Sequence, residues 1–558
     1  MKKERIEGID GLRALSILGI TFFHFFPNTI KGGYLGVCMF FILTGFFLSL
    51  SKVESWKTYY LKRIKRIYPA LLLMIFTTIG IYFFLLPDGI AAIRNEVISI
   101  LTGWNNWWQI SQNADYFTRI SNASMFTPLW FLSIEMQIYL VWPLAYILYH
   151  KVKKKKGIRF AHSCVLILIV LSAVWMMVQY HPNQDVTRLY YGTDTRLFSI
   201  LMGVYLGIIY QQHPLSKEKY IDLLITILFV ILFICFIFCD GQAAYMYRGG
   251  FFLISLLMTA LLYALLHKNR WISILENKVF LWIGRRSYEL FLWQYPVLFF
   301  FQSKNWNGIV SHLIEFVLIV FLAGWSHLFI SNFKKMKKDT SLISMSVLTV
   351  FFCLFGGVGL IQSKGQKDVN EMQAHIEKNA ESLKKQKKKK VKVAKKISIN
   401  DVYCVGDSVM LASAESLQNQ LPNCQINAEV SRQMVASISI VQDALNAGQI
   451  GKVVVVGLGT NGPLAQGDVD SLLDELGSER EVFWVNIYGP NLEWQDSNNQ
   501  LIDQLVKKHK NVHKIDWYSL ISQHPDWLWD DGIHPNDDGA NAYADLVRST
   551  IENTKSND

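Results

Sequence analysis

The chain has 558 residues, more than one hydrophobic core usually holds, so it is expected to contain several domains. It is 51% hydrophobic with a mean hydropathy of +0.22, which excludes an ordinary soluble protein. The formal net charge of +11 is uneven, because residues 397–558 carry 9 Lys and Arg against 23 Asp and Glu. The positive charges of the remaining, apolar part occur in short blocks between apolar runs, so we expect no nucleic-acid binding.

Eleven apolar runs in the first two thirds of the chain are long enough to cross a bilayer, which requires about 20 helical residues. They are residues 9–27, 34–51, 68–87, 129–149, 160–180, 196–212, 221–239, 249–267, 287–303, 308–331 and 342–361. The first run is not taken as a signal peptide, because another run follows closely and no small-residue cleavage pattern separates them. The sequence therefore predicts a multi-span α-helical membrane domain over residues 1–335, with ten spans, and an eleventh span within 336–365.

The lysine and arginine blocks predict an orientation for these spans. With the N-terminus in the cytoplasm, basic loops such as "KVESWKTYYLKRIKR", "HKVKKKKGIR" and "NFKKMKKD" all fall on the cytoplasmic side. The alternate loops, such as "HPNQDVTRLYYGTD", carry few positive charges. An odd number of spans then places the C-terminal part outside the cell.

Ionisable side chains inside spans are costly and indicate functional sites. His24 lies about 16 Å beyond Arg13 along the first span, and Glu135 lies about 10 Å from the outer end of the fourth. His24 and Glu135 thus reach comparable depths, and a carboxylate beside an imidazole is a general-base arrangement, although a polar packing pair is the alternative. Arg63 and Arg66 lie at the cytoplasmic face, where they either bind phosphate or set the topology.

Residues 366–396 are polar, lysine-rich and almost free of aromatic side chains, which predicts a flexible or partly helical extracellular linker. Its lysine run is either a solvated spacer or a patch attracted to anionic lipid or wall polymer.

Strands and helices alternate in residues 397–558, which predicts an extracellular, three-layer α/β domain with a parallel sheet that folds by itself. The expected strands are "DVYCV", "QINAEV", "KVVVVGLG", "EVFWVNIYG" and "VHKIDWY". Ligands of such sheets bind at the carboxyl ends of the strands. Cys404 and Cys424 could pair, but two cysteines make no disulfide framework, and no metal-ligand spacing occurs.

Four polar residues follow these strands or lie in the last loop. Ser408 opens a helix directly after the first strand, which is the placement that a nucleophilic serine needs. Asn461, in "GLGTNG", can donate to an oxyanion. Asp531 and His534 are three residues apart, so the carboxylate can orient the imidazole that takes the serine proton. Each motif alone is more often a turn, a loop or a capped helix start, but together they favour a nucleophilic-serine site.

The stretches "GDS", "GTNG" and "DGIHP" resemble three blocks of the SGNH (GDSL-like) hydrolase family. The resemblance implies that Ser408 is the nucleophile and Asn461 an oxyanion donor. It also implies that His534 is the general base and Asp531 its partner. The family usually has a second-block glycine whose N–H completes the oxyanion hole. This chain has "EVSRQM" there, so Ser431 is the candidate for that donor.

The stretches "GLRALSILGITFFH", "GVCMFFILTGFFLS", "KRIKRIYPA", "PLWFLSIEMQIYL" and "SYELFLWQYPV" resemble the membrane acyltransferase-3 family, in which acyl-CoA is the cytoplasmic donor. The resemblance implies that His24 and Glu135 carry the transfer and that Arg13, Arg63 and Arg66 hold the CoA phosphates. Many members have histidine in the last motif. Because this chain has glutamine there, at position 294, no second catalytic histidine is expected.

The combination resembles the peptidoglycan O-acetyltransferases of Gram-positive bacteria, the OatA type. This implies a multi-pass enzyme of the bacterial cell membrane, in contact with lipid. It would move acetyl from acetyl-CoA, as a donor substrate and not a bound cofactor, through an acetyl-serine to the C6 hydroxyl of N-acetylmuramic acid. One alternative is acetylation of another surface glycan, such as a capsule or wall N-acetylglucosamine. The other is a transporter or sensor with an independent esterase, although the spans show no internal repeat.

Overall fold

A computed structural model of the chain resolves two compact units, which we call the helical unit (1–112, 124–182 and 186–365) and the sheet unit (113–123, 183–185 and 366–558). The residues that the structure describes are 5–27, 29–85, 90, 93–111, 124–181, 186–212, 220–304, 306, 308–332, 340–362, 372, 374–376, 378–383, 402–422, 424–430, 432–489, 492, 494–529 and 531–557.

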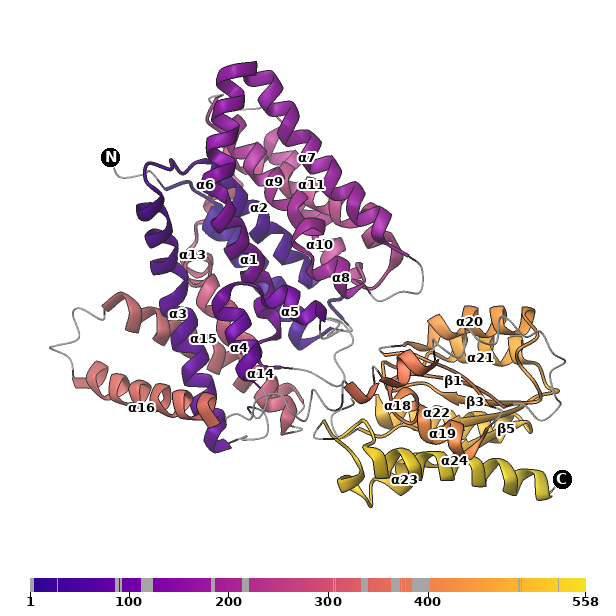
Figure 1. The fold of residues 1–558 in the computed structure, drawn as a ribbon. Helices are drawn as coiled ribbons and strands as arrows, with labels where there is room; N and C mark the ends of the chain where they lie inside the picture. Colours follow the sequence, from indigo (N-terminus) through magenta and orange to yellow (C-terminus); the bar gives the residue numbers. More distant parts are fainter. Residues whose placement is uncertain are drawn as a thin grey trace. The chain divides into compact units, whose positions relative to one another are not determined.

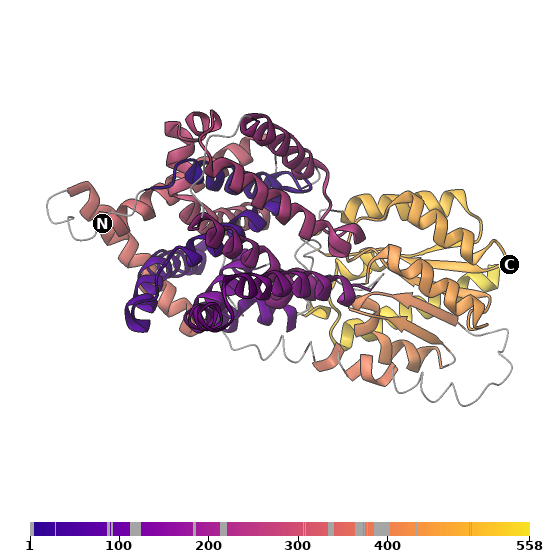
Figure 2. The same ribbon diagram turned by 90° about the horizontal axis from the view of Figure 1, so that it is seen from above.

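The helical unit is a bundle of helices in Figure 1, and Figure 2 shows the same bundle from above. Its elements are α1 (Ile9–Phe25), η1 (Gly33–Leu35), α2 (Gly36–Ser49), α3 (Trp56–Leu85), α4 (Arg94–Thr102), α5 (Asn105–Ser111), η3 (Thr127–Leu129), α6 (Trp130–Lys156), α7 (Ile158–Gln179), α8 (Thr187–Tyr191), α9 (Thr193–Tyr210), α10 (Ile221–Phe238), η4 (Met246–Gly250), α11 (Phe251–Leu266), α12 (Trp271–Leu275), α13 (Lys278–Arg285), α14 (Ser287–Ser303), α15 (Ile309–Asn332) and α16 (Thr340–Gln362).

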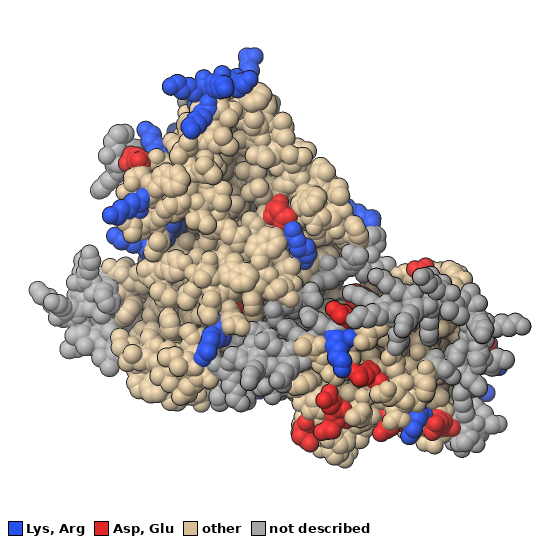
Figure 3. Space-filling view, in the orientation of Figure 1, with Lys and Arg blue, Asp and Glu red and all other residues tan. Residues whose placement is uncertain are grey.

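Among the described residues, six helices are long and apolar enough to cross a membrane. They are Trp56–Leu85, Thr127–Lys156, Ile158–Gln179, Ile221–Phe238, Met246–Leu266 and Ile309–Ser331. The other five predicted spans fall on α1, α2, α9, α14 and α16, so the full count of eleven stays a prediction. Figure 3 shows Lys and Arg gathered over the end of α6, whose last turn is Lys153–Lys156, and Asp and Glu over the visible face of the sheet unit.

Helices α2 and α9 cross with their backbones almost in contact. A Cβ atom added to Gly45 would lie 1.9 Å from the carbonyl oxygen of Ile200, and one added to Gly203 would lie 1.9 Å from that of Ile42. Small residues of this kind let membrane helices approach closely and gain dispersion contacts. The crossing therefore fixes α2, which forms one wall of the cavity described below.

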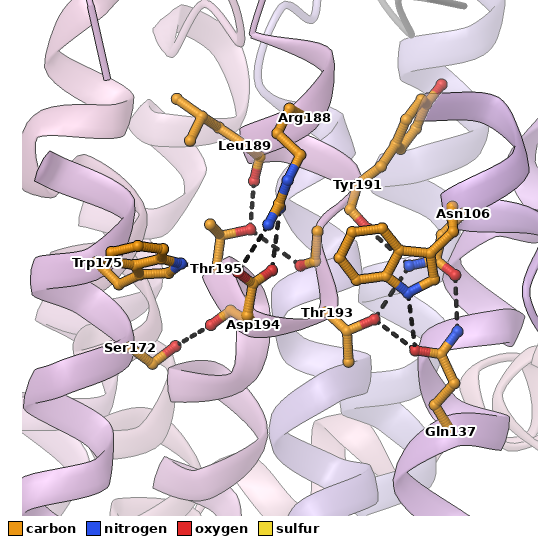
Figure 4. A network of polar contacts seen from close by, with 12 residues as sticks. Asn106, Gln137, Ser172, Trp175, Arg188, Leu189, Tyr191, Thr193, Asp194 and Thr195 are labelled. Atoms are coloured by element: carbon orange, nitrogen blue, oxygen red, sulfur yellow. Dashed lines mark hydrogen bonds and ion pairs between the residues drawn. The ribbon is translucent and has the colours of Figure 1, made fainter. Parts of the chain in front are cut away.

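A partly buried polar network anchors α6 to α5, α8 and α9 (Figure 4). The Gln137 amide donates to Asn106 Oδ1 over 2.8 Å and accepts from the Thr193 hydroxyl over 2.6 Å. Arg188 pairs with Asp194 in the same network, at 2.8 Å. Because unsatisfied polar groups are costly in an apolar environment, this network holds α6 in one rotational setting.

The sheet unit contains five parallel strands in the order β2-β1-β3-β4-β5, which confirms the predicted parallel sheet. The strands are β1 (Val402–Gly406), β2 (Gln425–Ala428), β3 (Val453–Gly457), β4 (Glu481–Val485) and β5 (Val512–Ile515). The helices are α18 (Ser408–Ala412), α19 (Ala414–Gln420), α20 (Met434–Asn446), α21 (Gln466–Leu476), α22 (Gln495–Lys508), α23 (Trp517–Ile521), η6 (Pro525–Trp527) and α24 (Asp537–Asn557).

The helices cover both faces of the sheet, and α20 and α21 lie opposite α24 in Figure 1. One core lies between the sheet and α18, α19 and α24, and the other lies between the sheet and α20, α21 and α22. Successive side chains of β1 pack alternately into the two cores, because the side chains of a strand alternate between its faces. Cys404, in β1, and Cys424, before β2, are both buried free thiols in this structure.

Part of the predicted linker packs onto the sheet unit as a helix. The described residues between 372 and 383 are helical, and Met372, Ile376 and Leu383 are buried in the core that contains α18. The Asn379 amide donates to the carbonyl oxygens of Leu411 and Ala412, at 3.1 and 3.0 Å. We call this segment the docked helix. It hydrogen-bonds carbonyl groups at the end of α18, so this part of the linker is helical. The lysine run that follows it lies outside the described residues.

Candidate active sites

Ser408 is the first residue of α18, immediately beyond β1, and its exposure is only 5%. Asp407 caps the helix, because its Oδ1 atom accepts from the Val409 N–H over 3.0 Å. Its other carboxylate oxygen accepts from the Thr460 N–H, which lies in the loop after β3, at 3.3 Å. Asp407 therefore holds two loops of the site together, at the carboxyl ends of the two central strands.

The imidazole of His534 connects Ser408 to a carboxylate. Its Nε2 atom lies 2.8 Å from Ser408 Oγ, and its Nδ1 atom is hydrogen-bonded to Asp531. Asp531 also accepts from the Ile533 and His534 N–H groups, at 2.9 and 3.0 Å, and Gly532 adopts a φ of 67° in the tight turn between them. With Nδ1–H donating to Asp531, Nε2 is the atom that can take the Ser408 proton.

Charge and burial shift the pKa values of His534 and Asp407. Burial alone would lower the pKa of His534, but the negative charge and hydrogen bond of Asp531 outweigh it and raise that pKa above 6.5. Burial also raises the pKa of Asp407 to about 6, although the N–H groups of Val409 and Thr460 partly offset the effect. His534 is therefore a stronger base than a free imidazole.

Asn461 lies in the loop after β3 and is buried, with an exposure of 9%. Within the described part of the chain, its amide nitrogen has no hydrogen-bond partner. Asn498 of α22 holds the loop, because its amide donates to Gly459 and Gly462 over 3.0 Å each and accepts from the Leu464 N–H over 2.8 Å. A buried, unpaired donor on a fixed loop suits an oxyanion that forms only during reaction.

The predicted second oxyanion donor, Ser431, lies outside the described residues. Its neighbour Arg432 is buried and hydrogen-bonds the Asn427 amide over 2.9 Å, which ties the start of α20 to β2.

A second site lies in the helical unit, where Glu135 and three arginines line one cavity of about 80 Å³. The Thr44 hydroxyl donates to the Glu135 carboxylate. A wider cavity of about 710 Å³ shares Arg13, Arg63 and Arg66 with the first, so the arginines stand where the two cavities meet. The structure thus brings together the predicted carboxylate and all three predicted arginines.

The arginines differ in their partners. Arg13 pairs with Asp10, 3.0 Å away, and Arg63 lies over the ring of Tyr139 at 4.8 Å. Arg66 is exposed at the cavity wall. Guanidinium groups gathered at the mouth of a cavity are suited to bind phosphate groups.

His24 is not among the residues that line this cavity. Its ring lies 5.4 Å from the ring of Tyr295 and 5.6 Å from that of Phe23. The neighbouring Thr21 donates to Gln294, which is buried, over 3.0 Å. The structure therefore places His24 against α14, and its part in any reaction with Glu135 stays a prediction.

Three residues of these sites were not predicted from the sequence. Asp407 carries a signal, because an aspartate directly before a helix start is a common cap. Asn498 could also have been predicted. It falls on the buried stripe of α22 with Ile502 and Leu505, where a polar side chain needs a hydrogen-bond partner. No sequence pattern predicts the role of Thr44, because its hydroxyl donates to Glu135, which is 91 residues away in the sequence.

Comparisons with known proteins agree over the whole chain. The acyltransferase-3 family model, described as an acyltransferase domain, matches residues 6–361. The O-acetyltransferase OatA of Staphylococcus aureus (strain MRSA252) is 31% identical and aligns with 99% of this chain and 97% of its own length. YrhL of Bacillus subtilis (strain 168), provisionally named a peptidoglycan O-acetyltransferase, is 27% identical over 97% of this chain and 98% of its own.

Among solved structures, the chain matches the C-terminal catalytic domain of Streptococcus pneumoniae peptidoglycan O-acetyltransferase A (OatA) with a methylsulfonyl adduct. The match has 25% identity and a TM-score of 0.27, and it covers 28% of this chain and 94% of that domain.

Proposed function

Because the chain belongs to the acyltransferase-3 family and is an O-acyltransferase of the membrane, we propose that it moves acetyl groups from cytoplasmic acetyl-CoA to hydroxyl groups of peptidoglycan. The proposed acceptor is the C6 hydroxyl of N-acetylmuramic acid. The relatives named above support peptidoglycan as the acceptor, since they match the chain from end to end.

In the sheet unit, His534 Nε2 takes the proton of the Ser408 hydroxyl while Ser408 Oγ attacks the carbonyl carbon of an incoming acetyl group. Asn461 donates to the oxyanion of the tetrahedral intermediate. The intermediate then collapses, and the carrier leaves with the proton from His534. This produces acetyl-Ser408.

The glycan hydroxyl completes the cycle in the reverse sense. His534 removes its proton as the hydroxyl oxygen attacks the acetyl-Ser408 carbonyl. The Ser408–acetyl bond breaks, and Ser408 Oγ regains the proton from His534. The acetyl group has then moved from serine to sugar, and the site is restored.

In the helical unit, the arginine-lined cavity is the proposed site of acetyl-CoA. The three arginines hold phosphate groups, and Glu135 lies next to the thioester and acts as the base of the first transfer, with His24 further along α1. The proposed reaction requires the three arginines to lie at the cytoplasmic face of the membrane and Ser408 to lie outside the cell. It agrees with the eleven-span topology proposed from the basic loops.

The observation that supports this function most strongly is the geometry of Ser408, His534 and Asp531. The amide nitrogen of Asn461, which has no hydrogen-bond partner among the described residues, adds to it. The experiment uses the full chain in membrane vesicles supplied with [¹⁴C]acetyl-CoA. We expect label on the protein at Ser408 and, with glycan strands present, on muramic acid. A Ser408→Ala variant that still labels the glycan would overturn the proposal.

A further inference from the structure

The cavity of Glu135 has a polar end and an apolar end, and α2 runs along it. Phe47 lines both this cavity and the wider one with the arginines, so it marks the polar end. Thr44 follows one turn away and is bound to Glu135. Phe40 is a further turn along α2, about 10 Å from Phe47 by helical rise.

The two other walls repeat this order. On α6, Tyr139 lies beneath Arg63, Glu135 follows one turn away, and Phe131 comes one turn further. On α14, Phe291 lines the cavity one turn beyond Ser287. Three helices therefore each present a phenylalanine at the same end of the cavity.

The three rings close that end. The Phe131 ring lies 5.5 Å from that of Phe291 and 6.1 Å from that of Phe40, measured between centroids. Phe131 and Phe291 are 7% and 6% exposed. The rings leave little space beyond Glu135, in a cavity of about 80 Å³ against about 710 Å³ on the arginine side.

We propose that Phe40, Phe131 and Phe291 limit the donor to short acyl chains, with acetyl as the group that fits. The proposal rests on the proposed acyl-CoA function. With phosphates at the arginines and the thioester beside Glu135, the acyl chain points at the three rings. A methyl group fits there, whereas each added methylene must displace a packed ring.

The residues of α14 lead from the cavity of Glu135 past Phe291 toward His24. Tyr295, whose ring contacts His24, lies one turn beyond Phe291 on α14. An acyl group that moves from the thioester position beside Glu135 toward the part of α1 that carries His24 would pass Phe291, which also favours a small group. The three phenylalanines therefore select for a short acyl chain both when the donor binds and when the acyl group is transferred.

The test measures transfer from acetyl-, butyryl- and hexanoyl-CoA by the full chain in vesicles, for the wild type, Phe131→Ala and Phe291→Ala. The wild type is expected to prefer acetyl strongly. In the variants, the rate with butyryl-CoA relative to acetyl-CoA should rise by about tenfold or more, the discrimination that a hydrophobic pocket gives per methylene.

Phe46→Ala is the control, because Phe46 is a fully buried phenylalanine of α2, the helix that carries Phe40, but does not line the cavity. It should leave the chain-length preference unchanged. Phe131→Leu covers the case in which the alanine variant fails to fold, and a smaller shift in the same direction is expected. Folded variants that keep the wild-type preference would overturn the proposal, as would a wild type that uses acetyl and butyryl equally. Absence of transfer from any acyl-CoA would instead count against the proposed donor.

Discussion

The site of the sheet unit depends on one largely buried carboxylate, Asp531, which acts through an imidazole. Asp531 accepts a hydrogen bond from the ring of His534 and two more from backbone N–H groups, so its position is fixed on all sides. It does two things: it selects the tautomer in which Nε2 faces Ser408, and it raises the pKa of His534 against the opposing effect of burial. These two effects can be separated experimentally.

We expect Asp531→Asn to lower activity and to move the acid limb of the pH–rate profile to lower pH. Without the carboxylate charge, burial prevails and the pKa of His534 falls, so the ring is deprotonated at a lower pH. The measurement is kcat/KM against pH with a small activated acetyl ester. An acid limb that stays in place would show that another group sets it. His534→Ala, which removes the base altogether, should lose more activity.

Asn461→Ala should lower kcat about 100-fold or more with little change in KM, because an oxyanion donor acts mainly in the transition state. Its amide has no partner to lose among the described residues, so stability should change little. Steady-state kinetics and a thermal melt of the same sample provide both readouts. A change confined to KM would make Asn461 a substrate-binding residue.

At the scale of single residues, the sequence was sufficient to predict catalytic side chains that lie in short, recognisable motifs. Ser408, His534 and Asp531 are of this kind, and the structure places them within hydrogen-bond reach of one another. Contacts between distant segments could not be predicted in this way. The bond from Thr44 to Glu135 exists only after α2 and α6 have packed.

At the scale of elements, patterns that repeat over many residues predicted the fold well. All five strands lie where the β-branched runs predicted them, and each of the eleven apolar runs coincides with a helix. Short polar helices such as α4, α5 and α8 were not predicted, because they are too short to show a period. The packing of the docked helix was not predicted, because the high lysine content of this segment indicated a linker. Its apolar residues at 372, 376, 380 and 383 nevertheless follow helical spacing.

The docked helix leads to a prediction about the stability of the sheet unit. A fragment of residues 366–558 should be more stable than one of residues 397–558, which loses the buried side chains of Met372, Ile376 and Leu383. Each such side chain contributes about 1.5–3 kcal/mol. Urea unfolding of the two fragments measures the difference, and equal midpoints would show that the helix adds nothing.

Within the longer fragment, Asn379→Ala should cost about 1–3 kcal/mol, because it removes two hydrogen bonds to carbonyl oxygens of α18, each worth about 0.5–1.5 kcal/mol. The Ala412 carbonyl keeps its contact with His375 Nε2, at 2.9 Å. Lys378→Ala is the neighbouring control. Its ion pair with Glu415 is exposed and should change stability by less than about 1 kcal/mol. If the two variants lose equal stability, the amide contacts are not what secures the helix.

For the whole molecule, the two sites should be separable. In the full chain, Glu135→Ala or His24→Ala should stop acetyl-CoA-dependent acetylation of the wall and leave hydrolysis of a soluble acetyl ester by the sheet unit unchanged. Ser408→Ala should stop both, while acetyl-CoA still binds the arginine cavity. Mass spectrometry of wall fragments and an ester assay on the same membranes measure the two activities. Wall acetylation that persists in His24→Ala at normal protein levels would remove His24 from the relay.

The docked helix also shortens the connection between the two units. Between the end of α16 at Gln362 and Met372 there are nine residues, which span at most about 30 Å when fully extended. If the chain were free as far as β1, 39 residues would be available. Effective concentration falls roughly as the −3/2 power of the length of a flexible tether, so a nine-residue connection would raise the local concentration of Ser408 about tenfold over one of 39 residues. Inserted glycine and serine residues should therefore slow acetyl transfer when placed within 363–371, but not when placed within 384–401.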